Sequence, residues 1–126
     1  MNISTLAARS GVSIHRLRRY EAAGLLRAQR SDGGYRDFSD TAVREAIFLR
    51  MGRELGLSLA VLAEALPRYR AGTLRLSELE DMLHARIAQV DAEIALQRAL
   101  RRKLVHHLAW CAQRRASAAV KKERGR

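Results

Sequence analysis

The chain has 126 residues, 48% of them hydrophobic but only 5% aromatic, and a formal net charge of +11 at pH 7. This length allows one small domain, or one compact domain with a long element outside it, and excludes two full-size cores. The excess of Lys and Arg indicates a polyanionic partner, nucleic acid before an anionic membrane, because no apolar run approaches the ~18 residues of a membrane-spanning helix.

Apolar residues that are mostly Leu, Ala, Ile and Val favour a mainly α-helical fold. The first six residues lack the charged and apolar segments of a secretory signal. Cys111 is the only cysteine, so no intrachain disulfide can form. We therefore expect a soluble protein in the reducing cytoplasm.

The N-terminal residues predict a helix-turn-helix. A short helix over 4–10 has hydroxyl residues at its start and is followed by Gly11, which suits a tight turn. Ser13 is a good N-cap for a second helix over 14–23, and Gly24 can end that helix in a left-handed conformation. The spacing of Ala7, Gly11 and Leu17 matches a small contact residue, a turn glycine and an apolar anchor.

The second helix carries a concentrated basic surface. Its core face is predicted to be Ile14, Leu17 and Ala22, whereas the opposite surface holds His15, Arg16, Arg18 and Arg19. Arginine can grip guanine O6 and N7 together or clamp a phosphate. The alternative is an ordinary solvated face, and the sequence does not decide which arginine reads bases.

A β-hairpin is predicted next, because residues 31–34 form a turn between the short segments 25–27 and 35–38. The hairpin is basic and contains one tyrosine. As a wing, the hairpin would contact the flanking DNA backbone through Arg27, Arg30, Arg36 and Tyr35. A second basic group beside the first favours DNA binding over a solvated face.

Two helices are predicted after the hairpin, one from Asp40 to Leu55 and one from the Ser58 cap onward. Pro67 cannot donate a backbone hydrogen bond, so the second of these either ends there or kinks and continues to Gly72. Both possibilities stay open. The capping box at Ser77–Glu80 then predicts the start of a long helix.

The long helix has apolar residues at steps of three or four, close to the spacing of a coiled coil. They are Leu76, Leu79, Leu83, Ile87, Val90, Ile94, Leu100 or Leu104, Leu108 and Cys111. One domain of this size cannot bury the whole stripe, which favours a homodimer over folding back onto the preceding helices. The charged residues of segment 76–95 are mostly acidic, and those of segment 96–115 are basic. This distribution predicts that the two helices of the dimer are antiparallel.

These patterns divide the chain into a DNA-binding domain over 1–72, a dimerisation helix over 73–113, and a tail over 114–126. The tail is rich in Lys and Arg and lacks an apolar pattern, so it is expected to be frayed or disordered. It would add non-specific attraction to phosphate or have no role.

Four ordered motifs in the first 66 residues resemble the MerR family of bacterial transcription regulators. They are Leu17-Arg18-Arg19-Tyr20-Glu21, then Gly24-Leu25-Leu26, then Gly34-Tyr35-Arg36, then Leu55-Gly56-Leu57-Ser58-Leu59. Arg19 departs from the pattern, because many relatives carry an aromatic residue there. The helix after Ser77 is similar to the family's dimerisation helix, which is antiparallel.

The resemblance implies a dimer that binds a near-palindrome inside an over-long promoter spacer and distorts the DNA so that RNA polymerase can use both promoter elements. It places Arg18, Arg19 and Tyr20 in the recognition helix, and Arg30, Tyr35 and Arg36 in the wing. With Ser13, His15 and Arg16 these are the predicted DNA-binding residues. The alternative is an accessory DNA-bending or excisionase-like protein that does not activate a promoter, and a third class is a purely structural coiled coil.

The resemblance leaves the effector unidentified. Metal-sensing relatives end the dimerisation helix with a cysteine and carry a second one a short loop later, whereas Cys111 is followed by Ala112–Arg115, a cationic stretch without cysteine. We therefore expect no metal site of that design and no cofactor. Cys111 is either a thiol sensor, activated by the nearby cations, or a packed cysteine of the helix seam. No catalytic constellation is found, so the chain is not expected to be an enzyme.

Overall fold

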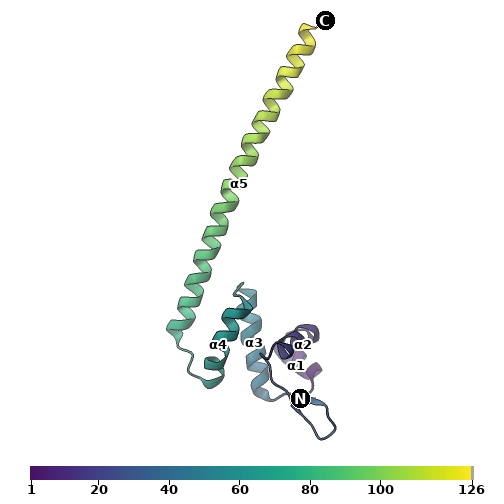
Figure 1. Ribbon diagram of the computed structural model, residues 1–126, viewed down its shortest axis with the longest axis vertical. Helices are drawn as coiled ribbons and strands as arrows, with labels where there is room; N and C mark the ends of the chain where they lie inside the picture. Colours follow the sequence, from purple (N-terminus) through teal and green to yellow (C-terminus); the bar gives the residue numbers. More distant parts are fainter. Residues whose placement is uncertain (126) are drawn as a thin grey trace. The chain divides into compact units, whose positions relative to one another are not determined.

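The computed structural model describes residues 1–125. It divides into two compact units, one ending at Leu83 and one beginning at His84, and each is described by itself. The elements in chain order are α1 (Ile3–Ser10), α2 (Ile14–Ala22), β1 (Gln29–Arg30), β2 (Arg36–Asp37), α3 (Asp40–Glu54), α4 (Leu59–Ala71) and α5 (Leu76–Arg124) (Figure 1). The mainly α-helical fold with a short hairpin and a long C-terminal helix is as predicted.

The helix-turn-helix is built from local caps. The Ser13 side chain accepts a hydrogen bond from the amide of Arg16 at 3.2 Å, and Gly11 and Gly24 take the left-handed φ angles of +74° and +77° that the turns require. The first helix differs from the prediction, because its cap is Asn2, which accepts from the amide of Thr5, rather than a hydroxyl of Ser4 or Thr5.

The core of the first unit is formed by apolar side chains of α1 to α4 and of the segments that connect them. These four helices lie together in Figure 1. Its fully buried members include Leu6, Leu17, Leu26, Phe38, Leu49, Leu62 and Leu66. Burial of each such side chain stabilises the fold by about 1.5–3 kcal/mol. The core holds α2 and the base of the hairpin on one common support.

Helices α3 and α4 approach closely at Gly52. A Cβ atom at this position would lie inside the van der Waals radius of both methyl groups of Leu62, which is itself buried. The absence of a side chain at Gly52 is therefore a packing requirement rather than a turn requirement.

Helix α4 continues through Pro67 to Ala71 and ends at Gly72, so the second of the two possibilities left open by the sequence is correct. Its last turn is held by tertiary contacts that outweigh the lost hydrogen bond. The ring of Tyr69 stacks on Phe48 with centroids 4.4 Å apart, and Arg70 forms an ion pair with Glu45.

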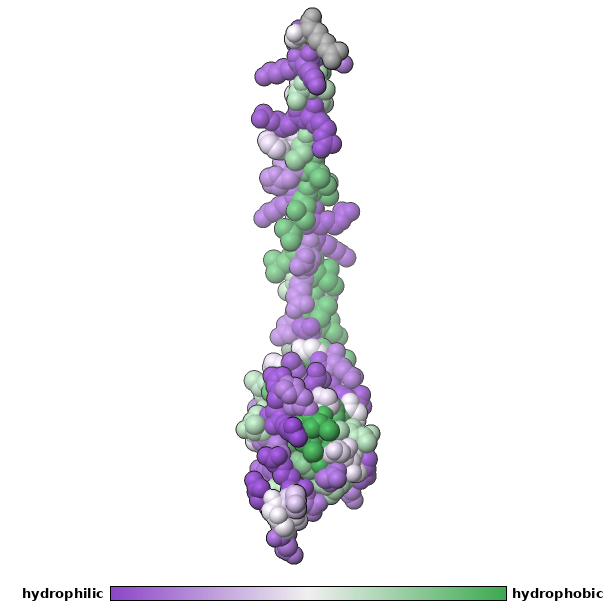
Figure 2. Space-filling view, turned by 90° about the vertical axis from the view of Figure 1, so that its right-hand side faces the viewer, coloured by the Kyte–Doolittle hydropathy of each residue, from purple (hydrophilic) through white to green (hydrophobic). Residues whose placement is uncertain are grey.

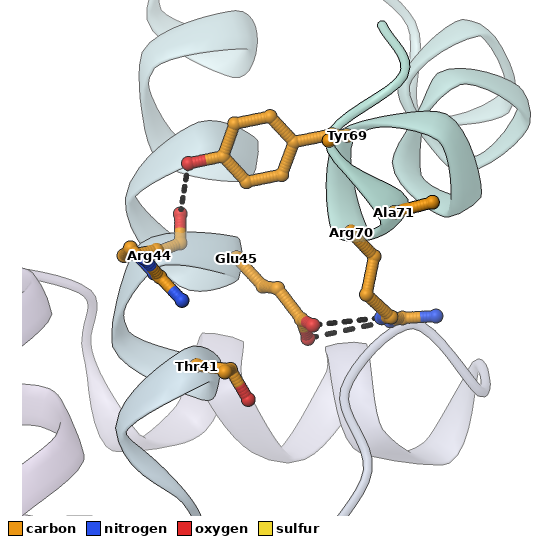
Figure 3. A pocket seen from close by; sticks show the side chains of 7 residues that line it. Thr41, Arg44, Glu45, Tyr69, Arg70 and Ala71 are labelled. Carbon is orange, nitrogen blue, oxygen red and sulfur yellow. Dashed lines mark hydrogen bonds and ion pairs between the residues drawn. The ribbon is translucent and has the colours of Figure 1, made fainter.

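The pair of Glu45 and Arg70 is the most buried ion pair of the first unit (Figure 3). Arg70 Nε lies 2.7 Å from Glu45 Oε1, and one terminal nitrogen of Arg70 donates to the other carboxylate oxygen at 3.3 Å and to the carbonyl oxygen of Leu25 at 2.9 Å. Arg70 thus connects α3 and α4 to the segment that leads into the hairpin.

Helix α5 begins at Leu76, two residues before the start at Glu78 that a cap at Ser77 predicts, so Ser77 lies inside its first turn. Glu78 of that turn accepts from Arg68 Nε at 2.7 Å, and this hydrogen bond raises the pKa of the Arg68 guanidinium against the opposing effect of desolvation. The interaction fixes the start of α5 on α4.

Helix α5 also ends later than predicted. It continues to Arg124, whereas residues 114–126 were expected to be frayed or disordered; Arg126 lies outside the described residues. Ala, Lys and Arg are strong helix formers, and residues 112–124 contain neither Gly nor Pro. No described helix is both long and apolar enough to span a membrane.

Candidate nucleic-acid interface

Helix α2 presents a basic outer face. Leu17 and Tyr20 are buried, whereas His15, Arg16, Arg18 and Arg19 are exposed. At 100° per residue, His15 and Arg19 lie at the centre of the exposed face, with Arg18 at one margin and Arg16 at the other. Four side chains able to donate hydrogen bonds to bases or phosphates therefore share one short helix.

Two residues of α2 differ from their predicted places. Ala22 was predicted to face the core but is exposed, because five residues on from Leu17 the helix has turned by about 140°. Tyr20, predicted to contact DNA, has only 5% of its surface exposed and belongs to the core cluster. Its ring is thus part of the core, and a contact of Tyr20 with DNA stays a prediction.

A hollow beside α2 contains an arginine that the sequence analysis did not identify. Tyr20 lines this hollow together with Arg16 and Arg19 of α2, and Arg53 and Leu59 reach it from the ends of α3 and α4. Arg53 donates to the carbonyl oxygen of Leu57 at 2.9 Å, which orients its guanidinium. In the sequence Arg53 resembles any cation in the last turn of a helix, so no local signal distinguishes it.

The hairpin is a two-stranded antiparallel ladder in which Gln29 pairs with Asp37 and Arg30 with Arg36. Its turn is closed by hydrogen bonds between Ser31 and Tyr35 and between Gly34 and Ser31, each 2.8 Å long. Gly34 takes a φ angle of +79°, which explains the glycine at this place.

Three of the four predicted wing residues differ in their surroundings. Tyr35 is 77% exposed, so its ring can contact a partner without moving. The Arg30 guanidinium donates to the carbonyl oxygen of Gly34 at 3.0 Å, and Arg36 Nε lies 2.8 Å from Glu21 Oε1 of α2. The structure thus brings the predicted residues of helix and wing onto one unit. Their contacts with DNA stay a prediction.

The C-terminal half of α5 holds the predicted effector residue. Cys111 is exposed, and beside it the Arg114 guanidinium lies over the Trp110 ring at 5.4 Å from the centroid. Within residues 1–125 there is no group of three or more His, Cys, Asp or Glu side chains arranged to hold a metal ion. The role of Cys111 stays a prediction.

Comparison with known protein families gives two matches. The pattern described as MerR HTH family regulatory protein matches residues 1–69, and the pattern described as MerR, DNA binding matches residues 43–107. Together they cover the helix-turn-helix, the hairpin, α3, α4 and most of α5.

Individual proteins agree with these matches. The HTH-type transcriptional regulator HmrR of Rhizobium leguminosarum bv. viciae is 32% identical over 88% of this chain and 86% of its own length. The transcription regulator PbrR691 from Ralstonia metallidurans CH34, solved in complex with lead(II), superposes with a TM-score of 0.72 at 28% identity over 83% of both chains. HiNmlR, a regulator lacking the sensor domain and solved bound to promoter DNA, gives a TM-score of 0.58 at 25% identity over 79% of this chain and 77% of its own.

Proposed function

Because this chain belongs to the MerR family of transcriptional regulators, we propose that it binds a near-palindromic operator inside a promoter as an antiparallel homodimer. It regulates transcription by distorting an over-long promoter spacer, so that RNA polymerase can use both promoter elements. The regulator acts in the cytoplasm, where promoter DNA is, and it has no enzymatic activity. The observation that carries this proposal is the exposed basic face of α2, together with the basic wing that the ion pair of Arg36 and Glu21 joins to that helix.

The base-reading role falls to the exposed arginines of α2, and Arg18 is the best test. Its loss is expected to weaken operator binding by about 1–3 kcal/mol, roughly 5- to 150-fold, and to change binding to random duplex much less. Arg75→Ala, which removes an exposed arginine between α4 and α5, is the charge-matched control. Equal losses on both DNAs would make Arg18 a phosphate contact instead.

The target is best sought by footprinting the DNA upstream of the chain's own gene and its neighbour, with and without oxidant and metal ions. Protection between the two promoter elements is the expected result. Protection elsewhere would contradict the spacer mechanism, and equal binding to operator and random duplex at moderate salt would contradict sequence-specific binding.

Dimerisation is supported by apolar side chains that α5 leaves exposed (Figure 2). In the second unit they recur along one helix, with Ile87, Ile94, Leu100, Leu104 and Leu108 each at least 40% exposed. An isolated helix cannot cover such a stripe, whereas a second copy can. The acidic half of α5 in one copy then faces the basic half of the other.

The first unit contains a second apolar surface suited to a copy of the chain. Residues of α3, α4 and the first turns of α5 line a groove with few polar atoms, and within it Met51 and Leu55 are both 55% exposed. Leu79 and Leu83 on the same groove continue the stripe of α5. The groove is therefore a further apolar surface that we assign to contact with a second copy.

The antiparallel arrangement is tested with the native cysteine. If the two helices cross at the boundary between their charged halves, the two copies of Cys111 are about 45 Å apart and cannot be joined. A short bismaleimide should leave the native chain uncoupled and should couple Ile94→Cys in a Cys111→Ser background. Efficient coupling through Cys111 would indicate parallel helices.

A further inference from the structure

An acidic residue occupies the DNA-reading helix. Glu21 of α2 forms an ion pair with Arg36 of β2, with Arg36 Nε 2.8 Å from Glu21 Oε1. The pair joins two elements that are fifteen residues apart in sequence and that are otherwise linked through the core. It is a direct polar connection between recognition helix and wing.

The two side chains of the pair differ in how deeply they are buried. The Glu21 side chain is only 21% exposed, and its Oε2 atom is buried without a hydrogen-bond partner among residues 1–125. The Arg36 side chain is 49% exposed. The carboxylate is therefore fixed beside α2, whereas the guanidinium extends from it toward solvent.

The chemistry of the guanidinium allows Arg36 to serve two partners. Its five N–H donors lie in one plane, and the Glu21 carboxylate lies beside Nε as an ion pair. The end edge of the guanidinium, formed by the two terminal nitrogens, has the geometry for bidentate binding of a phosphate. A lysine, with one compact charge, could not be held at one edge while presenting another.

We propose that Glu21 is a positioning residue for DNA binding, because its carboxylate holds the Arg36 guanidinium and the wing strand in the orientation that meets a DNA phosphate. This inference rests on the proposed function, in which α2 and the wing bind the operator. It predicts that removal of the Glu21 carboxylate weakens DNA binding, which is the opposite of what simple electrostatics predicts. A carboxylate near DNA repels phosphate, so its removal should strengthen binding unless it positions a contact.

The test compares four variants of the full chain on the footprinted operator and on random duplex, by fluorescence anisotropy at several salt concentrations. Glu21→Gln is expected to weaken operator binding about tenfold, and Arg36→Gln by a similar factor. The double variant should be no weaker than Arg36→Gln, since both changes remove the same contact. Arg36→Lys should resemble Glu21→Gln, although it keeps the charge.

Asp32→Asn is the matched control. Asp32 is an exposed carboxylate of the wing turn, so its neutralisation removes the same charge without touching the pair of Glu21 and Arg36, and binding should be unchanged or tighter. Circular dichroism and urea unfolding verify that each variant is folded. In both single Gln variants the slope of log affinity against log salt concentration should decrease in magnitude by about one, which corresponds to the loss of one phosphate contact.

The outcomes separate the inference from the proposed function. If the native chain prefers the operator but Glu21→Gln binds as tightly or more tightly, the positioning role is wrong while the function stands. Additive losses in the double variant, or full activity of Arg36→Lys, would also overturn it. If the native chain shows no preference for the operator, the proposed function fails first.

Discussion

Removal of Arg70 should destabilise the first unit strongly, because it leaves a buried carboxylate without its partner. In the native structure the Glu45 side chain is 8% exposed and receives two donors from Arg70, at 2.7 and 3.3 Å. Arg70→Ala removes both, together with the donor to the Leu25 carbonyl oxygen. Breaking a buried pair from one side costs about 3–5 kcal/mol.

Replacement of Glu45 should cost less stability than replacement of Arg70. Arg70 is 26% exposed, so in Glu45→Gln its guanidinium is in contact with water. It also keeps its hydrogen bond to the carbonyl oxygen of Leu25. We expect Glu45→Gln to cost about 1.5–3 kcal/mol, the loss of a charged hydrogen bond. Adding Glu45→Gln to Arg70→Ala should restore part of the stability, because the uncompensated charge is then gone.

Urea unfolding followed by far-UV circular dichroism measures these differences, at one fixed protein concentration because dimerisation contributes to the midpoint. The reasoning is refuted if Arg70→Ala costs less than about 1 kcal/mol, or if the double variant loses the sum of both single changes. Either result would mean that water reaches the Glu45 carboxylate more easily than its burial indicates.

Three further predictions concern packing, DNA affinity and the thiol. Gly52→Ala should destabilise the chain by about 1–3 kcal/mol although alanine favours helix, and the double variant with Leu62→Ala should lose less than the sum of the two single changes; urea unfolding that shows higher stability for Gly52→Ala alone would contradict the close approach of α3 and α4. Arg53→Ala should weaken binding to operator and random duplex alike and lower the salt slope by about one, whereas an operator-specific loss in anisotropy would make Arg53 a base reader. Cys111→Ser should leave the affinity for both DNAs intact without oxidant, and a loss of operator affinity in that variant would place the thiol in the fold or the dimer.

Much of the reading unit is predictable from sequence because its signals are local. The Ser13 cap acts within three residues of itself, and Gly11 and Gly24 mark turns through their own φ angles. The basic face of α2 follows from helical periodicity once those ends are known. The hairpin follows in the same way from a turn sequence between two short segments.

Tertiary contacts decided what local sequence preferences left open. The sequence allowed α4 to end at Pro67 or to continue, and the contacts of Tyr69 with Phe48 and of Arg70 with Glu45 carry the helix beyond it. Tyr20 has the sequence context of a DNA-contacting residue, and only the structure shows that its ring is part of the core. Helix α5 continues beyond residue 113 for a local reason, because Ala, Lys and Arg are strong helix formers even where no apolar pattern is present.

The sequence alone therefore determined the mainly α-helical class, the position of the reading helix and the family, because caps, turns and ordered motifs each depend on residues close together in the chain. Only the tertiary structure decided that Arg53 lies beside α2, that Glu21 holds Arg36, and that Arg70 connects α4 to the hairpin segment. These pairs are separated by fifteen to forty-five residues in the sequence. The two residues of each pair come into contact because the shared core packs their elements together. No local sequence pattern predicts such a contact.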